Sequence, residues 1–92
     1  MKTIGMIFDD VTSLNAAFYM HAYSGCQYNP DIEVNTGMRE IKYLNVIYKY
    51  IIIKDEKDVM KIAGINFDSI FSEVKDPYCK NWILSRFRPR FD

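Results

Sequence analysis

Residues 48–73 read YKYIIIKDEKDVMKIAGINFDSIFSE, and this stretch decides the fold class. It begins with an apolar run of the β-branched and aromatic residues that strands favour. Asp55 follows, a residue type that caps helices, and Asp58 stands three positions later as in a capping box. Gly64 then ends the helical segment, and a second apolar run leads to Glu73. The stretch therefore predicts a strand, a helix and a second strand, which is the basic unit of an α/β fold.

The N-terminal quarter of the chain predicts another strand followed by a helix. Residues 3–8 form a nearly continuous apolar run, typical of a central strand that is buried on both faces. Residues 13–24 carry apolar side chains at helical spacing, after Thr12 or Ser13 as the N-cap. Gly25 stands where a helix commonly ends. We therefore expect a helix over 13–24.

The middle of the chain has the composition of strands. Residues 32–35 alternate between apolar and polar side chains and predict a short strand. Residues 39–44 alternate in the same way, and residues 46–53 are rich in β-branched and aromatic side chains. These two segments predict either a hairpin or one long bent strand. A helix over 37–48 is the less favoured alternative.

The C-terminal third predicts a strand over 67–74, a turn at Asp76-Pro77 and a last helix over 79–87 that stops before Pro89. The inward residues of the two later helices are expected to be Val59, Met60, Ile62 and Ala63, and then Trp82 and Ile83. The predicted order is strand, helix, strand, strand, helix, strand, helix. This order favours a small α/β domain of two or three layers, with a mainly parallel sheet and right-handed crossovers.

Length and composition set limits on the protein's class. Ninety-two residues make one domain, 1–92, with a basic C-terminal tail at 85–92. Twelve basic residues balance twelve acidic ones, so the net charge favours neither nucleic acid nor membrane. Two cysteines make no disulfide framework, and no apolar run approaches the ~20 residues that span a membrane. We expect a cytoplasmic protein without a membrane partner, from an AT-rich genome such as that of a phage.

Two acids follow the first predicted strand. Asp9 and Asp10 stand where open α/β sheets bind ligands, and carboxylate oxygens are the ligands that Mg²⁺ prefers. They are candidate metal ligands, and with Asp68 and Glu73 they define the hypothesis of a magnesium-dependent nucleotide or phosphate enzyme. The alternative, which we favour, is that Asp9 or Asp10 caps the following helix.

The stretch that decides the fold also resembles a known family. Part of it is similar to the Walker B region of phage large-terminase-like P-loop ATPases. The matching parts are residues 51–53, the helix near 58–63, Gly64, the step Phe67-Asp68 and the run Ile70-Phe71 ending at Glu73. The resemblance covers about a quarter of the chain. The corresponding first loop, FDDVTSLN, has neither the glycines nor the lysine of a Walker A loop. The resemblance therefore implies a nucleotide-binding architecture in which hydrolysis is lost.

The C-terminal sequence SRFRPRF interleaves arginine with phenylalanine. Such a tail can clamp phosphates and stack bases, or bind an acidic groove on a protein. The alternative is a solvated tail whose phenylalanines dock on the domain. The candidate partner-binding residues are Lys80, Arg86, Phe87, Arg88 and Arg90.

The remaining chemistry-bearing residues predict no active site. Cys26, Cys79 and His21 are too few and wrongly spaced for zinc. A Cys26–His21 contact across a helix end is conceivable, but a buried cysteine and a surface histidine are the favoured interpretation.

Three functional hypotheses follow, in this order of preference. The first is a non-enzymatic binding protein without a cofactor, plausible as a phage accessory or inhibitor, that uses exposed tyrosines and the tail on a protein partner. It is expected to form a homodimer, because a short chain gains by pairing its strand edges. The second is a nucleic-acid-binding protein using the tail. The third is the metal-dependent enzyme described above.

Overall fold

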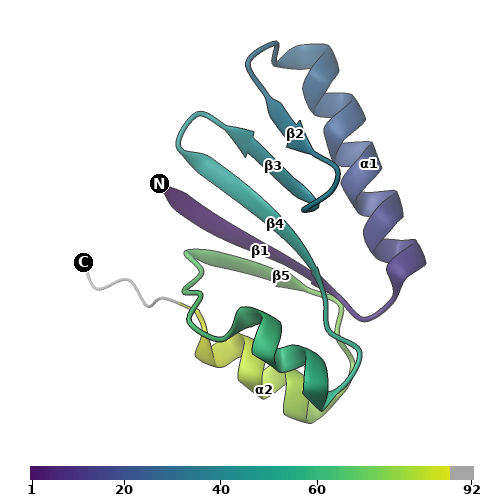
Figure 1. Ribbon diagram of the computed structural model, residues 1–92, viewed down its shortest axis with the longest axis vertical. Coiled ribbons are helices and arrows are strands. Elements are labelled where there is room, and N and C mark those ends of the chain that lie inside the picture. The colour runs from purple at the N-terminus through teal and green to yellow at the C-terminus, as the bar shows by residue number, and fades with distance from the viewer. Residues whose placement is uncertain (88–92) are drawn as a thin grey trace.

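The computed structural model describes residues 1–87 as one α/β domain with a five-stranded mixed sheet. The strands lie in the order β2-β3-β4-β1-β5 (Figure 1). The elements are β1 (Lys2–Phe8), α1 (Val11–Tyr28), β2 (Glu33–Asn35), β3 (Glu40–Tyr43), β4 (Val46–Ile52), η1 (Glu56–Ile62), β5 (Ser69–Ser72) and α2 (Pro77–Ser85). The α/β class is therefore confirmed.

The sheet is mixed, whereas the sequence predicted a mainly parallel one. β1 pairs in parallel with β4 on one side and β5 on the other, but β2–β3 and β3–β4 are antiparallel pairs. The reason is local: Leu44, with φ of 55°, and Asn45 join Tyr43 to its partner Val46, and a two-residue loop permits only antiparallel pairing. Of the two alternatives for this region, the hairpin is correct.

The first helix begins earlier and ends later than the sequence predicted. Asp10, rather than Thr12 or Ser13, is its N-cap, and the helix continues through Gly25 to Tyr28. Gly25 does not end the helix, because its missing side chain is where the Ile32 side chain packs. A β-carbon at position 25 would meet Cδ1 of Ile32, so this glycine serves packing and not termination.

The connection from β4 to β5 is a 3₁₀ helix, η1. Asp55 caps it by accepting a hydrogen bond from Lys57 N, and Asp58 accepts one from Lys54 N at 2.8 Å. Gly64 follows it with φ of +82°, as expected for a terminating glycine. Val59 and Ile62 are buried as predicted, but Met60 is 68% exposed because a 3₁₀ helix turns faster per residue than an α-helix.

Helices lie on both faces of the sheet, so the domain has three layers. On one face, Phe18 and Leu14 of α1 pack against Phe8, Ile41 and Tyr50 of the strands. On the other face, η1 and α2 cover the half of the sheet around β1 and β5 (Figure 1). The residues of that second core are Ile7, Ile53, Val59, Ile62, Phe67, Val74, Cys79 and Ile83. No helix in residues 1–87 is both long and apolar enough to cross a membrane.

Candidate functional site

The carboxyl ends of β1 and β5 form a crevice where an α/β sheet is expected to bind a ligand. The chain leaves β1 for α1 on one face and leaves β5 for α2 on the other, so this is a point where the topology switches. A cavity of about 630 Å³ lies there. Its lining brings together acids and bases that are distant in sequence, namely Asp9, Asp10, Glu73, Lys75 and Lys80.

Two of the acids in this crevice, Asp9 and Asp10, bind the chain's own backbone. Asp10 accepts hydrogen bonds from the Ser13 N–H at 2.8 Å and the Ser13 hydroxyl at 2.9 Å, and these bonds hold the pKa of its carboxyl below the ordinary value. Asp9 accepts a bond from Lys75 N at 3.0 Å. Within residues 1–87, no group of three or more His, Cys, Asp or Glu side chains is placed to hold a metal ion. Asp10 thus has the capping role, and metal binding by Asp9 and Asp10 stays a prediction.

The acids of the enzyme hypothesis do not all meet. Glu73 lines the crevice after β5, whereas Asp68 lies before β5, where it accepts a hydrogen bond from Thr3 N at 2.8 Å.

The residues that resemble a Walker B region lie on β4, η1 and β5, and these two strands flank β1. In the loop between β1 and α1, the Asp10 carboxylate accepts a hydrogen bond from the Ser13 N–H, which is the kind of donor that binds phosphate in a P-loop. Kinship with that family stays a prediction.

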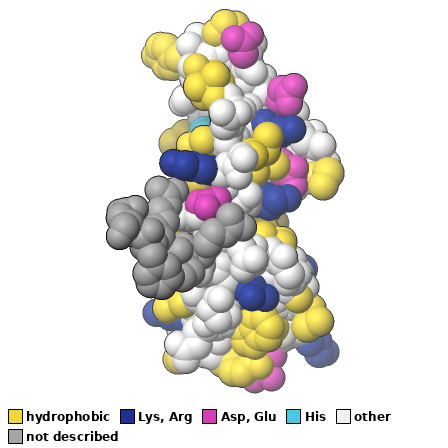
Figure 2. Space-filling model, turned by 90° about the vertical axis from the view of Figure 1, so that its left-hand side faces the viewer, with side chains coloured by type: hydrophobic (Ala, Val, Ile, Leu, Met, Phe, Trp, Pro, Cys, Tyr) yellow, Lys and Arg dark blue, Asp and Glu magenta, His cyan; other side chains and the backbone are white. Residues whose placement is uncertain are grey.

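The described candidate partner-binding residues lie on and after α2. Lys80 is exposed within the helix and lines the crevice, whereas Arg86 is the half-buried C-cap. Phe87 bridges to Phe67, and Phe67 N donates to Arg86 O at 2.8 Å. Arg88 and Arg90 lie outside the described residues. Figure 2 shows acidic and basic side chains interspersed with hydrophobic ones on the face at the left of Figure 1.

The outward side of α1 is a surface of a different kind. Across its 18 residues the helix contains no Asp, Glu, Lys or Arg. Met20 is 72% exposed and Tyr23 is 68% exposed, and both point away from the sheet core. We define the α1 face as the exposed residues on this side, namely Thr12, Ser13, Ala16, Met20, Tyr23, Ser24 and Gln27.

This composition is unusual for a helix that covers a sheet. Such a helix normally carries charged and polar residues on its solvent side. The solvent side of α1 carries polar residues but no charged ones. The inward side of α1 is ordinary, with Leu14, Phe18 and Ala22 in the core. The α1 face is therefore an exposed surface without charge that presents Met20 and Tyr23, residue types enriched at the centres of protein interfaces.

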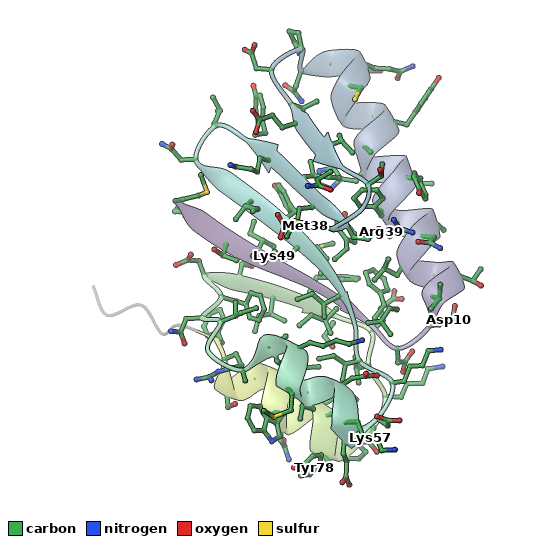
Figure 3. The ribbon with its side chains drawn as sticks, in the orientation of Figure 1. Asp10, Met38, Arg39, Lys49, Lys57 and Tyr78 are labelled. Carbon is green, nitrogen blue, oxygen red and sulfur yellow. The ribbon has the colours of Figure 1, made fainter. Side chains whose placement is uncertain are left out.

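One basic side chain fixes α1 to the sheet from its flank. Arg39 donates from Nε to Asn15 Oδ1 at 3.1 Å, and its guanidinium lies 5.6 Å from the ring centres of both Phe18 and Tyr19 (Figure 3). Its backbone O accepts a bond from Tyr50 N at 2.9 Å. The loop before β3 thus holds α1 against the sheet.

Sequence reasoning identified tyrosines in general as contact groups but missed the α1 face. The signal was present in the sequence, because residues 11–28 contain no charge. Of the other residues considered, Cys26 is exposed and Cys79 is fully buried. His21 is not a surface histidine: it is half-buried and bonds to Tyr50.

Comparisons of this chain with protein-family models, with curated proteins and with solved structures found no match.

Proposed function

We propose that this protein is a non-catalytic binding domain that docks on another protein through the α1 face. One observation carries the proposal: an 18-residue helix without a charged side chain exposes Met20 and Tyr23 to solvent. Covering this face removes apolar surface from water without separating any charge from its hydration shell.

The chemistry of the α1 face suits an interface. Tyrosine and methionine are enriched at the centres of interfaces, and charged residues other than arginine are depleted there. Ala16, Met20, Tyr23 and Gln27 follow one another at spacings of four, three and four residues. This spacing makes one continuous stripe along a helix, to which a second helix packs. An 18-residue helix is roughly 27 Å long at 1.5 Å per residue, enough for several turns of contact.

The partner that best fits this stripe is a second copy of the chain. If two α1 helices packed antiparallel about a two-fold axis at Met20, the large Tyr23 of one copy would lie near the small Ala16 of the other. A two-fold interface must be self-complementary, and an uncharged stripe with a large residue on one side of its centre and a small one on the other meets that condition. The homodimer expected from the sequence would then form through helices and not through strand edges.

The test is sedimentation velocity of the wild-type chain over a range of concentrations, beside Met20→Glu and Leu84→Glu. Leu84 is a matched control, because it is an apolar residue that is 64% exposed on a different helix. We expect the wild type and Leu84→Glu to self-associate and Met20→Glu to stay monomeric. Association that all three proteins share equally would contradict the proposal.

A monomeric wild-type protein would exclude the second copy as partner and leave a different protein to be found. Each of the three proteins, immobilised, would then be exposed to an extract of its native cell. A polypeptide retained by the wild type and Leu84→Glu but released by Met20→Glu would support docking through the α1 face. Identical retention on all three would contradict it. A domain that acts by covering a partner's surface has the properties of a cytoplasmic accessory or inhibitor subunit, the role that the sequence favoured.

A further inference from the structure

A small cavity lies at the C-terminal end of α1, beside the α1 face, with which it shares only Ser24. Its volume is about 300 Å³, at the lower end of the range for small-molecule sites. Four aromatic side chains contribute to its lining, together with the polar Ser24 and Asn29; the aromatic residues are His21, Tyr28, Tyr43 and Tyr48.

The rings come from three elements, and contacts within the fold hold His21 and Tyr48 in place. Tyr48 pairs with Ile41 across β3 and β4, so Tyr43, two positions along, lies on the same face of the sheet as Tyr48. The His21 ring stands perpendicular to the Tyr48 ring, with ring centres 4.6 Å apart. His21 Nδ1 is 2.8 Å from the Tyr50 hydroxyl, and this hydrogen bond fixes the orientation of the imidazole.

The electrostatics of the cavity favour a positive charge. The faces of aromatic rings are electron-rich and attract cations. Tyr28 is the last residue of α1, where the helix dipole places partial negative charge, and the last turn contains no basic residue that would neutralise it. Burial lowers the pKa of His21, so the imidazole is neutral at pH 7 and does not repel a cation.

The absence of a carboxylate among the lining residues selects the kind of cation. A primary ammonium group that entered would lose strong hydration and gain no ion pair. A quaternary ammonium group is weakly hydrated, has an apolar surface, and binds to aromatic rings without needing a hydrogen-bond acceptor. We propose that this cavity binds a small quaternary ammonium compound of the size of choline.

The probe is choline chloride, titrated into the folded full chain and followed by the NMR chemical shifts of His21, Tyr28, Tyr43 and Tyr48. The comparator is 3,3-dimethylbutan-1-ol, which has the shape of choline without its charge, and sodium chloride keeps the ionic strength constant. We expect choline to shift these resonances saturably. We expect the neutral alcohol to bind at least roughly fivefold more weakly, because it gains no cation–π attraction.

Variants at exposed positions keep the test independent of folding. Tyr28 is 79% exposed, so Tyr28→Leu should fold normally yet weaken choline binding by roughly fivefold, whereas Tyr28→Phe should retain it. Tyr23→Leu is the matched control, because Tyr23 lies on the same helix, is 68% exposed and does not line the cavity. The proposal is overturned if choline causes no saturable shift, if the neutral alcohol binds as tightly, or if Tyr23→Leu weakens binding as much as Tyr28→Leu.

Discussion

His21 Nδ1 lies 2.8 Å from the phenolic oxygen of Tyr50, and this hydrogen bond ties α1 to the centre of the sheet. Tyr50 is 5% exposed and packs edge-on against Phe18, with ring centres 5.3 Å apart. Burial raises the pKa of Tyr50 to about 12, so the phenol keeps its proton at every pH at which the fold is expected to persist. The pair is a polar contact within a core layer that is otherwise apolar.

Replacing Tyr50 by phenylalanine tests that contact. The variant keeps the ring packing but leaves His21 Nδ1 without its partner in a half-buried place, so we expect a loss of about 1 to 2 kcal/mol in the free energy of unfolding. Urea denaturation measures it. Tyr23→Phe is the control, because Tyr23 lies on the exposed side of α1, the helix that carries His21. It removes a hydroxyl that is exposed to water, so it should change stability little. Equal effects of the two substitutions would show that the contact contributes nothing.

The same histidine predicts how stability depends on pH. Burial lowers the pKa of His21 below its ordinary value of 6.5, so near that pH the unfolded chain binds a proton more readily than the folded one. Stability should therefore fall as the pH drops below about 6.5, with a slope of at most about 1.4 kcal/mol per pH unit. Thermal unfolding of the wild type and of His21→Gln across this pH range measures the loss of stability, which should be absent in the variant.

A separate loss of stability is expected in stronger acid. Hydrogen bonds from backbone N–H groups hold the pKa values of Asp10, Asp58 and Asp76 below the ordinary 3.8, so their contribution is present above that pH and is lost as the pH falls through the lowered values. The His21→Gln variant should keep this acid transition unchanged. A histidine-dependent shift of the acid transition would contradict the assignment.

Gly5 on β1 is predicted to tolerate no side chain. A β-carbon there would lie 2.9 Å from two ring atoms of Phe67, which is fully buried. We expect Gly5→Ala to cost about 1 to 3 kcal/mol, as overpacking of a core does. Gly37→Ala is the control, because the nearest atom outside the adjacent residues lies 3.5 Å from the new carbon.

The cause can be separated by a double-variant cycle. Phe67→Leu makes room beside Gly5, so Gly5→Ala should cost less in that background than in the wild type. An unchanged cost would mean that strand geometry, and not the Phe67 ring, excludes alanine.

Arg39 is expected to stabilise the packing of α1 more than a residue near the surface usually does. Arg39→Ala removes the bond to Asn15 and the contacts with the Phe18 and Tyr19 rings, and we expect a loss of about 1 to 2 kcal/mol. Arg39→Lys keeps the charge but lacks the Nε–H, so it should recover only part of the loss. Denaturant unfolding of the three proteins decides this, and full recovery by lysine would mean that charge alone matters.

The two cysteines should differ sharply in reactivity. Cys26 is exposed, whereas Cys79 is fully buried, and burial raises the pKa of the Cys79 thiol to about 11. Iodoacetamide should therefore modify one thiol per folded chain and both after denaturation, because the thiolate is the reactive form. Mass spectrometry of digested protein locates the label, and early labelling of Cys79 would contradict the burial of α2 against the sheet.

The sequence predicted those elements whose signals are local. Asp55 with Gly64 brackets η1 as predicted, because caps and terminating glycines act through their immediate neighbours. The predicted turn at Asp76-Pro77 is instead the N-cap and first residue of α2, which begins two residues before the expected Cys79. Sequence reasoning failed at Gly25, where a contact with Ile32 from outside the helix overrides the usual meaning of glycine. It also failed at Met60, whose direction depends on the choice between a 3₁₀ and an α-helix.

The partner-binding role of Lys80 and Arg86 stays a prediction, with Lys80 on α2 and Arg86 as its C-cap. The sequence interpretation of His21 was wrong for a related reason. It treated His21 as a surface residue, because nothing within a few positions of His21 shows that Tyr50 of β4 will reach it. The uncharged stretch 11–28 was visible in the sequence, but its meaning depended on knowing which side of the helix faces the sheet.

The sequence by itself determined the α/β class, the strand-helix-strand character of residues 48–73 and the absence of charge along α1, because these depend on residue type and spacing alone. The tertiary structure alone decided that the sheet is mixed, that Asp10 holds backbone at the crevice, and that four aromatic rings from α1, β3 and β4 line one cavity. Those features depend on contacts between residues far apart in the chain. Packing sets such contacts. The α1 face is an uncharged exposed surface only because packing buries the other side of the helix.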